Sequence, residues 1–335
     1  MYDACKDIFT TSDDGCRELD VKMREFKKEK QKLNDERTEY NRLIRTEARK
    51  ESYADMVKRI VRQETVPYAF DGNEVKVDDY DKNSLLIHLT DIHTGIEIDN
   101  FYNQFNEDVL IGRLSRFLNE IQEVQHRHKS ENAYIVIGEI VSGIIHNNLR
   151  IQNNLDLMEQ FMLISEQIAS MLVRLSKIFK EIQVYVTPGN HSRVSPKKED
   201  SLDGENMDVL LPFYLSAKLQ NYQNILIINN AIDPEIAIFN IYDVLVMAAH
   251  GHKDSPTSIV QNFTMLFRQK PDIVLLGHRH TNGLTTVYDT KVIESGCVSG
   301  TDQYALSIRK ANKPEQTISV INEKGLCCIY DIRLE

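Results

Sequence analysis

The stretch LLIHLTDIH, residues 85–93, is an apolar run that ends in an aspartate and a histidine. Its first five residues have the length and branching typical of a buried strand, and Asp91 and His93 follow at the carboxyl end of that strand. In α/β sheets, ligands bind in the crevice beyond the carboxyl ends of the strands. The residues that follow each apolar run therefore indicate what chemistry the fold can carry.

Further apolar runs end in the same way. They are YIVI (134–137) before Glu139, IQVYV (182–186) before Asn190 and His191, VLVMAA (244–249) before His250 and His252, and IVLL (273–276) before His278 and His280. A lone histidine is more often structural than a ligand, but that explanation does not cover a whole series of strand ends. Imidazole, carboxylate and amide groups together suit divalent manganese, iron, zinc or nickel rather than calcium. There are too many candidates for one ion, whereas two ions that share a bridging carboxylate would use them all.

Helical segments alternate with these runs. Apolar residues recur at helical spacing over 110–124 and 157–175, and a further strand is expected at 225–228. The segments 285–296 and 326–334 add strands without intervening helices, which predicts that part of the sheet structure is antiparallel. The fold class predicted is α/β, with layered mixed β-sheets flanked by helices and preceded by a long N-terminal helix.

The N-terminal part of the chain differs in composition from the rest of the sequence. Residues 17–64 are charge-dense and contain no glycine or proline, so residues 1–80 are interpreted as a charged helical extension. Residues 84–335, which contain the apolar runs and the residues that follow them, are interpreted as the catalytic domain. Leu19, Phe26, Leu33 and Tyr40 recur every seven residues, but charged residues occupy the companion positions. Two interpretations stay open: a solvated helix, or a short coiled coil that joins two protomers into a homodimer through residues 17–64.

Composition limits the classes of protein that fit. The chain has 335 residues, a net charge of −10 and five cysteines without C-x-x-C spacing. Such a cysteine pattern favours the reducing cytoplasm, and no apolar run approaches the roughly 20 residues of a membrane span. The acidic balance weighs against a surface that coats nucleic acid.

In order, the motifs DIH, GEIVSG, GNH, HGH and GHRH over about residues 84–300 make the chain resemble the calcineurin-like metallophosphoesterase superfamily. The phrase GEIVSGIIHNNLR also resembles phage-encoded members, and there is a distant similarity to DNA-repair exonucleases that combine this fold with a helical partner-binding element. One such motif alone would be weak evidence. Five in the family's order, each at a strand end, are specific.

The resemblance implies a role for each of these residues. A first metal would be held by Asp91, His93 and His280, and a second by Asn190, His250 and His278, with Glu139 bridging the two. The two divalent ions, manganese by preference and otherwise iron, zinc or nickel, would activate the water that attacks phosphorus in line. His191 would contact the phosphate and protonate the leaving oxygen, while His252 and Arg193 would touch the substrate.

Residue 139 departs from the family pattern, which has aspartate at the bridging position. Glutamate is one methylene longer, which displaces the carboxylate by roughly 1.5 Å. Metal–ligand distances tolerate only about 0.2 Å. A retreat of the backbone, a loosely held metal or a loss of activity is therefore expected.

Three functions are compatible with this pattern. The first is a metal-dependent phosphodiesterase of nuclease type that acts on nucleic acid, with DNA as a candidate substrate. The second is a phosphatase or phosphodiesterase for small nucleotides, which the acidic domain favours. The third is a catalytically silenced scaffold, which Glu139 favours.

Overall fold

The computed structural model describes residues 21–44, 55, 82–145, 151–202 and 204–335. Its contacts divide the chain into two units, Met1–Thr65 and Val66–Glu335. The boundary predicted at residues 80–84 adjoins a stretch outside the described residues, so these domain limits stay a prediction. Within the described residues, no helix is long and apolar enough to cross a membrane.

In the first unit, residues 21–44 form one helix. Three members of the seven-residue repeat, Phe26, Leu33 and Tyr40, are 68%, 64% and 64% exposed. Leu19 and residues 45–54 and 56–64 of the predicted coiled coil lie outside the described residues. Pairing of two protomers through this helix stays a prediction.

The second unit contains two large mixed sheets. The six-stranded sheet has the order β13-β12-β1-β4-β5-β6, and the five-stranded sheet has the order β10-β11-β9-β8-β7. Strands of the first are β1 (Ser84–Leu89), β4 (Asn132–Ile137), β5 (Glu181–Val186), β6 (Ile225–Ile227), β12 (Glu315–Asn322) and β13 (Gly325–Arg333). Strands of the second are β7 (Ala237–Ile241), β8 (Val244–Ala249), β9 (Ile273–Leu276), β10 (Gly283–Val287) and β11 (Thr290–Glu294). A short hairpin pairs β2 (Ile98–Asp99) with β3 (Gln104–Phe105).

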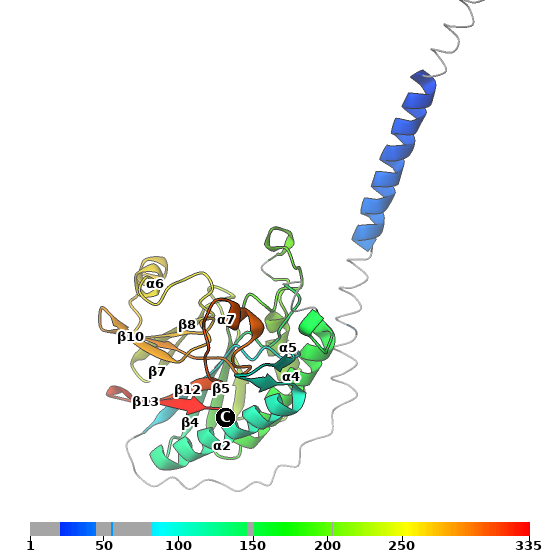
Figure 1. Cartoon of the computed structure of the whole chain (residues 1–335). Coiled ribbons are helices and arrows are strands. Elements are labelled where there is room, and N and C mark those ends of the chain that lie inside the picture. Colours follow the sequence, from blue (N-terminus) through cyan, green and yellow to red (C-terminus); the bar gives the residue numbers. More distant parts are fainter. Residues whose placement is uncertain (1–20, 45–54, 56–81, 146–150, 203) are drawn as a thin grey trace, which may run out of the picture. The chain divides into compact units, whose positions relative to one another are not determined.

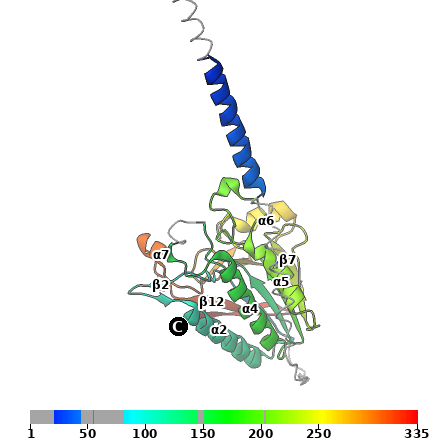
Figure 2. The same cartoon turned by 90° about the vertical axis from the view of Figure 1, so that its right-hand side faces the viewer.

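Helices surround the two sheets and the loops at their edges. They are α2 (Glu107–His128), α4 (Leu157–Leu175), α5 (Leu211–Lys218), α6 (Ile259–Phe267) and α7 (Gln303–Ser307), with 3₁₀ turns η1 (Lys198–Asp200) and η2 (Met207–Leu210). Helices α2 and α4 lie along the six-stranded sheet, whereas α6 packs against the five-stranded one (Figure 1 and Figure 2). Asp156 caps α4 through a capping box with Glu159, which fixes where this helix begins.

The core between the sheets is apolar because alternate strand residues face inward. Leu86, Val136 and Tyr185 from the six-stranded sheet form one buried cluster with Phe239 and Leu275 from the five-stranded one. The parallel strands β1, β4 and β5 run side by side, as do β8 and β9. Their carboxyl ends therefore open on a shared edge, and the predicted layered α/β fold is confirmed.

The predicted antiparallel parts are also present. Strands β10 and β11 form an antiparallel hairpin, and β13 pairs antiparallel with β12. Strand β12 joins this pair to the parallel part of the sheet by running antiparallel to β1. Beyond the expectation, β11 pairs parallel with β9, so the hairpin extends the second sheet.

His88 lies in the middle of β1 and is 1% exposed. Neither of its ring nitrogens has a hydrogen-bond partner among the described residues, and burial lowers the pKa of the ring from 6.5 to about 4. The folded state thus keeps His88 neutral, while the unfolded chain takes up a proton below pH 6.5. The titration of His88 costs no stability at neutral pH, and this cost grows as the pH falls from 6.5 toward 4.

Replacing His88 by leucine is therefore expected to make the free energy of unfolding fall less steeply as the pH drops below 6.5. Relative to the wild type, the variant should gain roughly 3 kcal/mol of unfolding free energy between pH 6.5 and about 4. Urea unfolding at several pH values measures this difference, with the exposed His126→Gln as control. Parallel curves for wild type and His88→Leu would show that His88 does not titrate in this way.

Candidate metal centre

The ligand-bearing residues sit on strained backbone just after the strands. Five predicted ligands have left-handed φ angles: 51° at Asp91, 53° at His93, 48° at Glu139, 69° at His278 and 58° at His280. Non-glycine residues seldom adopt this conformation, and it costs of order 1–3 kcal/mol each. Such strain, repeated at successive strand ends, indicates a functional site rather than ordinary turns.

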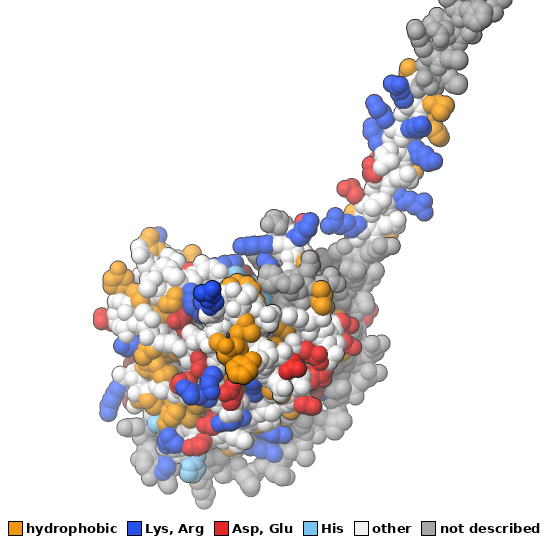
Figure 3. Space-filling model, viewed as in Figure 1, with side chains coloured by type: hydrophobic (Ala, Val, Ile, Leu, Met, Phe, Trp, Pro, Cys, Tyr) orange, Lys and Arg blue, Asp and Glu red, His pale blue; other side chains and the backbone are white. Residues whose placement is uncertain are grey.

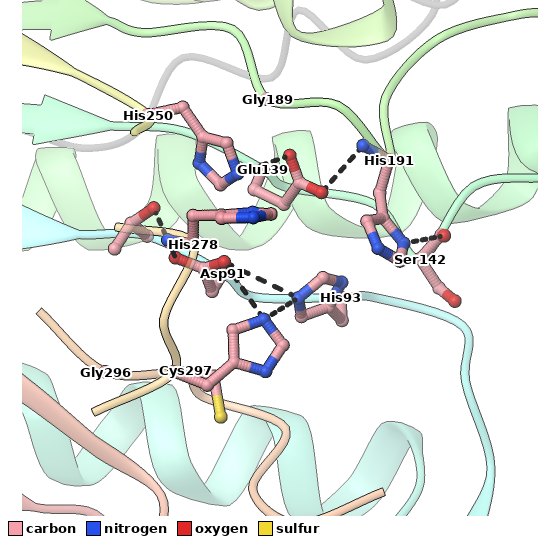
Figure 4. Close-up of polar contacts among 12 residues, drawn as sticks. Asp91, His93, Glu139, Ser142, Gly189, His191, His250, His278, Gly296 and Cys297 are labelled. Carbon is pink, nitrogen blue, oxygen red and sulfur yellow. Dashed lines mark hydrogen bonds and ion pairs between the residues drawn. The ribbon is translucent and has the colours of Figure 1, made fainter. Parts of the chain in front are cut away.

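The first predicted ligand set converges. Asp91 Oδ1 lies 3.7 Å from His93 Nε2 and 3.2 Å from His280 Nε2, and the two histidine nitrogens are 3.1 Å apart. Figure 4 shows the side chains of Asp91 and His93 pointing toward each other. The other carboxylate oxygen of Asp91 accepts hydrogen bonds from Thr90 Oγ1 and from the His278 backbone N–H. These bonds fix the carboxylate, so Asp91, His93 and His280 form a group that is able to hold one ion.

The second predicted set lies beside the first. His250 Nε2 is 3.3 Å from Glu139 Oε2, and the rings of His250 and His278 are 5.2 Å apart. Asn190 lies in the loop between Gly189 and His191, and its buried Oδ1 has no hydrogen-bond partner among the described residues. His250 is buried, whereas the His278 side chain is exposed, so this set lies at the mouth of the site.

Glu139 connects the two sets. Its Oε1 accepts a 2.7 Å hydrogen bond from the backbone N–H of His191, and its Oε2 faces His250. Glu139 also forms a second possible ligand group with His93 and His191. A Cβ atom at Gly189 would overlap the Glu139 carboxylate, so the glycine of the GNH motif leaves the room that the longer side chain takes up. The structure therefore places Glu139 between His93 of the first set and His250 of the second, and its bridging role stays a prediction.

The electrostatics of the two carboxylates differ. Burial raises the pKa of Asp91, but His250, His280 and His93 outweigh it and hold that pKa well below its usual range. Burial, together with the charges of Asp91 and Asp208, raises the pKa of Glu139 well above its usual range. Two buried carboxylates side by side cannot both ionise without added positive charge. Bound cations would supply that charge.

Three of the four predicted histidine ligands are in the state that metal binding requires, whereas His280 is held protonated by its neighbours. Burial lowers the pKa of His250 well below its ordinary value, and it lowers the pKa values of His93 and His278 as well. Burial also opposes the charge on His280, but neighbouring Cys297 and Asp91 raise its pKa well above the usual value. The rings of His93, His250 and His278 are thus neutral at pH 7, the form in which imidazole binds a metal.

Unpaired buried atoms show that two ions fit these residues. Asp91 Oδ1, Glu139 Oε2, Asn190 Oδ1 and both ring nitrogens of His250 are buried without hydrogen-bond partners among the described residues. Buried polar atoms are normally paired. These atoms belong to both ligand sets, and the carboxylate and amide oxygens and one nitrogen of the neutral His250 ring can each donate an electron pair. Their clustering is what a pair of cations would satisfy.

His191 is oriented by a backbone group. Its Nδ1 lies 3.0 Å from the carbonyl oxygen of Ser142, and its ring packs edge-on against His93 at 4.7 Å between centroids. A carbonyl only accepts hydrogen bonds, so Nδ1 carries a proton there and Nε2 is the ring nitrogen left to face other groups. The bond also gives Ser142, which had no predicted role, a function in holding this ring.

The two predicted substrate contacts lie at the outer side of the second set. The ring of His252 is 5.5 Å from His250 and 6.2 Å from His278. Burial and the nearby charge of Lys253 lower the pKa of His252 to about 4, with smaller contributions from Lys198 and Arg193. Arg193 is half-buried, and its Nε has no hydrogen-bond partner among the described residues. The structure therefore groups His252 and Arg193 beside the metal ligands.

Sequence reasoning missed Asp208. This fully buried carboxylate accepts hydrogen bonds from the backbone N–H groups of Glu139, Ile140 and Gly189 and from Ser192 Oγ. Asp208 thereby ties the loop after β4 to the loop after β5. No motif marks it, because it lies 16 residues beyond Ser192 in a polar loop.

Paired mixed sheets with carboxylates and imidazoles at their carboxyl ends define a metal-dependent hydrolase site. A family model for the calcineurin-like phosphoesterases matches residues 85–295, and the chain belongs to this family. The family depends on two metal ions and hydrolyses phosphoesters. The superfamily predicted from the ordered motifs is thus confirmed.

Similar proteins include a prophage product. The SPbeta prophage-derived uncharacterized protein YonJ of Bacillus subtilis strain 168 is 23% identical over 339 residues, covering 96% of this chain and 81% of the relative. The predicted similarity to phage-encoded members is confirmed by this match. Among solved structures, a novel archaeal phosphodiesterase has a TM-score of 0.37 at 14% identity, covering 74% of this chain and 99% of that one. Vacuolar protein sorting 29 from Cryptosporidium parvum has a TM-score of 0.38 at 16% identity, covering 76% and 93%.

Proposed function

We propose that this protein is a metal-dependent phosphodiesterase that acts on nucleic acid, with turnover limited by Glu139. The observation that carries the proposal is the pair of ligand sets facing each other across Glu139, with unpaired buried donor atoms on both sides. Asp91, His93 and His280 would hold one divalent ion, and Asn190, His250 and His278 the other. Manganese is the ion proposed, because the ligands mix oxygen and imidazole nitrogen.

When bound, the two ions would acidify a coordinated water and neutralise the charge of the phosphoryl group. The chain's own residues account for the rest. Asp91 and Glu139 supply negative charge that holds the ions. His191, kept in one orientation by the Ser142 carbonyl, would in its doubly protonated form give the Nε2 proton to the leaving oxygen and keep the proton on Nδ1. Arg193 and His252 would hold the non-bridging oxygens or the next phosphate.

A diester substrate is favoured by the charges around His252. Arg193, Lys198 and Lys253 all act on this ring, although the chain as a whole carries −10. Lys253 forms an ion pair with Glu235 at 2.6 Å, which offsets its charge. Arg193 and Lys198 are therefore left as the main cations beside His252. Several positive groups beside one scissile phosphate suit a substrate with further phosphates.

Rates with manganese on a nitrophenyl phosphodiester, a nucleotide monoester and linear DNA test the proposal. We expect chelator-sensitive hydrolysis of the diester and of DNA. Hydrolysis of the nucleotide alone would support the second candidate, a small-nucleotide phosphatase, which the acidic charge of the chain favours. No hydrolysis of any substrate, by wild type or by Glu139→Asp, would indicate the silenced scaffold.

Glu139→Asp is expected to raise the rate of diester hydrolysis about tenfold, which corresponds to about 1.4 kcal/mol of barrier. In the wild type, Oε1 of Glu139 accepts a hydrogen bond from the His191 backbone N–H, and the side chain packs over Gly189. The shorter aspartate would not reach this N–H, so its oxygen would be free to bridge two ions. Steady-state rates at saturating manganese measure the effect, with the exposed Glu97→Asp as a control. An unchanged or lower rate would contradict impairment by Glu139.

A further inference from the structure

Three aromatic side chains on the β2–β3 turn and on α7 are unusually exposed. Phe101 and Tyr102, in the turn between β2 and β3, are 94% and 60% exposed, and Tyr304 in α7 is 70% exposed. We call these three residues the aromatic surface. Large exposed apolar groups that gather in one place mark binding sites.

Hydrogen bonds hold the two segments of the aromatic surface together. The side chain of Asn100, just before Phe101, donates to the Thr301 carbonyl at 3.1 Å, and Asn103 donates to the Ser299 carbonyl at 2.7 Å. The buried guanidinium of Arg113 binds the carbonyls of Val298 and Ser299 from below, at 2.8 and 2.9 Å. The β2–β3 hairpin and α7 accordingly lie side by side in both views (Figure 1 and Figure 2).

The same loop connects the aromatic surface to the metal centre. The Val298 backbone N–H donates to the carbonyl of Asp91 at 3.0 Å, and Cys297 is near enough to His280 to raise the pKa of that ring. Asp302, which caps α7, is near enough to His93 for its charge to act on that ring. The loop 297–302 therefore runs from the first ligand set to α7, which carries Tyr304.

Positive charge accompanies the aromatic groups. Arg309 and Lys310 follow α7 directly, and both are exposed. Neither forms an ion pair with any residue that the structure describes. Figure 3 shows hydrophobic and basic side chains next to each other over α7. An otherwise acidic chain thus presents aromatic rings and cations together at this place.

We propose that the aromatic surface, with Arg309 and Lys310, binds single-stranded DNA and leads it into the metal centre. The proposal rests on the proposed function and specifies its substrate. Bases stack on exposed aromatic rings while cations hold the phosphates, and this combination typifies proteins that bind single strands. A duplex keeps its base faces hidden and cannot use the rings. A purely apolar partner would leave Arg309 and Lys310 without a counter-charge.

Fluorescence anisotropy of a labelled short oligothymidylate tests the proposal, with the full-length chain in EDTA so that no strand is cut. Phe101→Ala and Tyr304→Ala should each weaken binding about tenfold, and the double variant roughly a hundredfold. Tyr288→Ala, on the turn between β10 and β11, removes an equally exposed ring (73%) and should leave the affinity unchanged. Unaltered binding by the double variant, or equal affinity of the wild type for duplex DNA or for RNA, would overturn the proposal.

The salt dependence of the same binding tests the cations. Arg309→Gln with Lys310→Gln should reduce the slope of log affinity against log salt by about 1.4, which is roughly 0.7 for each single-strand phosphate contact. Lys324→Gln, exposed at the turn between β12 and β13, is the control and should not change the slope. An unchanged slope in the double variant would remove Arg309 and Lys310 from the DNA site.

The two proposals fail in different experiments. Binding in EDTA does not depend on turnover, whereas hydrolysis of a nitrophenyl diester does not need a DNA strand. Diester hydrolysis with oligonucleotide binding that ignores the aromatic surface would refute only the DNA site. Oligonucleotide binding that depends on the surface, without hydrolysis of any diester, would support the DNA site and refute the proposed function alone.

Discussion

Asp91→Asn is expected to lower metal-dependent hydrolysis of both the diester and DNA by about 10³-fold or more. Asparagine keeps the shape of the side chain and can still accept the His278 backbone N–H through one oxygen. It removes the negative charge of the first ligand set, which faces His93 and His280 within 3.7 Å. A metal stabilises the transition state by several kcal/mol, and about 4 kcal/mol corresponds to 10³ in rate.

Manganese titration by calorimetry, alongside the rates, shows whether the loss arises at the metal. We expect Asp91→Asn to bind one ion fewer or much more weakly. Asp99→Asn is the matched control, because this carboxylate is exposed on β2. Within the described residues, its side chain accepts one hydrogen bond, from the side chain of Gln104. A variant at position 91 with wild-type rate and stoichiometry would exclude this carboxylate as a ligand.

His191→Gln is the second substitution for which we expect a large loss of hydrolysis rate. The size of this loss should depend on the leaving group. Loss of a general acid costs about 10²–10⁴ in rate when the leaving oxygen is a strong base, as the alkoxide of DNA is. Nitrophenolate is a weak base and leaves without protonation. We therefore expect roughly a 10³-fold loss on DNA and about tenfold or less on the nitrophenyl diester.

Glutamine at 191 retains an amide that can donate to the Ser142 carbonyl, so the loop should keep its arrangement. His126→Gln, on the exposed side of α2, controls for a histidine substitution elsewhere. Equal losses on both substrates would assign His191 to phosphate binding rather than to proton transfer.

Much of this site could be predicted because its ligands follow short apolar runs. Each run is long enough to be a strand, and the residues just after it, such as Asp91 and His280, can only lie at the edge of the sheet. Helix 157–175 was equally accessible, since Asp156 and Glu159 form a capping box that the local sequence encodes. Local signals of this kind do not depend on the rest of the fold.

Other parts of the site could not be predicted, because they depend on contacts between distant segments. Asp208 serves backbone N–H groups 19 and 69 residues away. Ser142 acts through its carbonyl oxygen, which every residue possesses, so its type gives no signal. The sequence alone does not show that Phe101 and Tyr304 belong to one surface. Their segments are joined by a hydrogen bond from the Asn100 side chain to the Thr301 carbonyl, which only the structure reveals.

The central claim is that Asp91, His93, Glu139, Asn190, His250, His278 and His280 form one dinuclear centre. A crystal soaked in manganese, with anomalous scattering recorded at the manganese edge, tests it most directly. The account predicts two peaks about 3.5–4 Å apart between Asp91 and His250, with a Glu139 oxygen between them. Peaks only at surface carboxylates, or none beside Asp91, would contradict it.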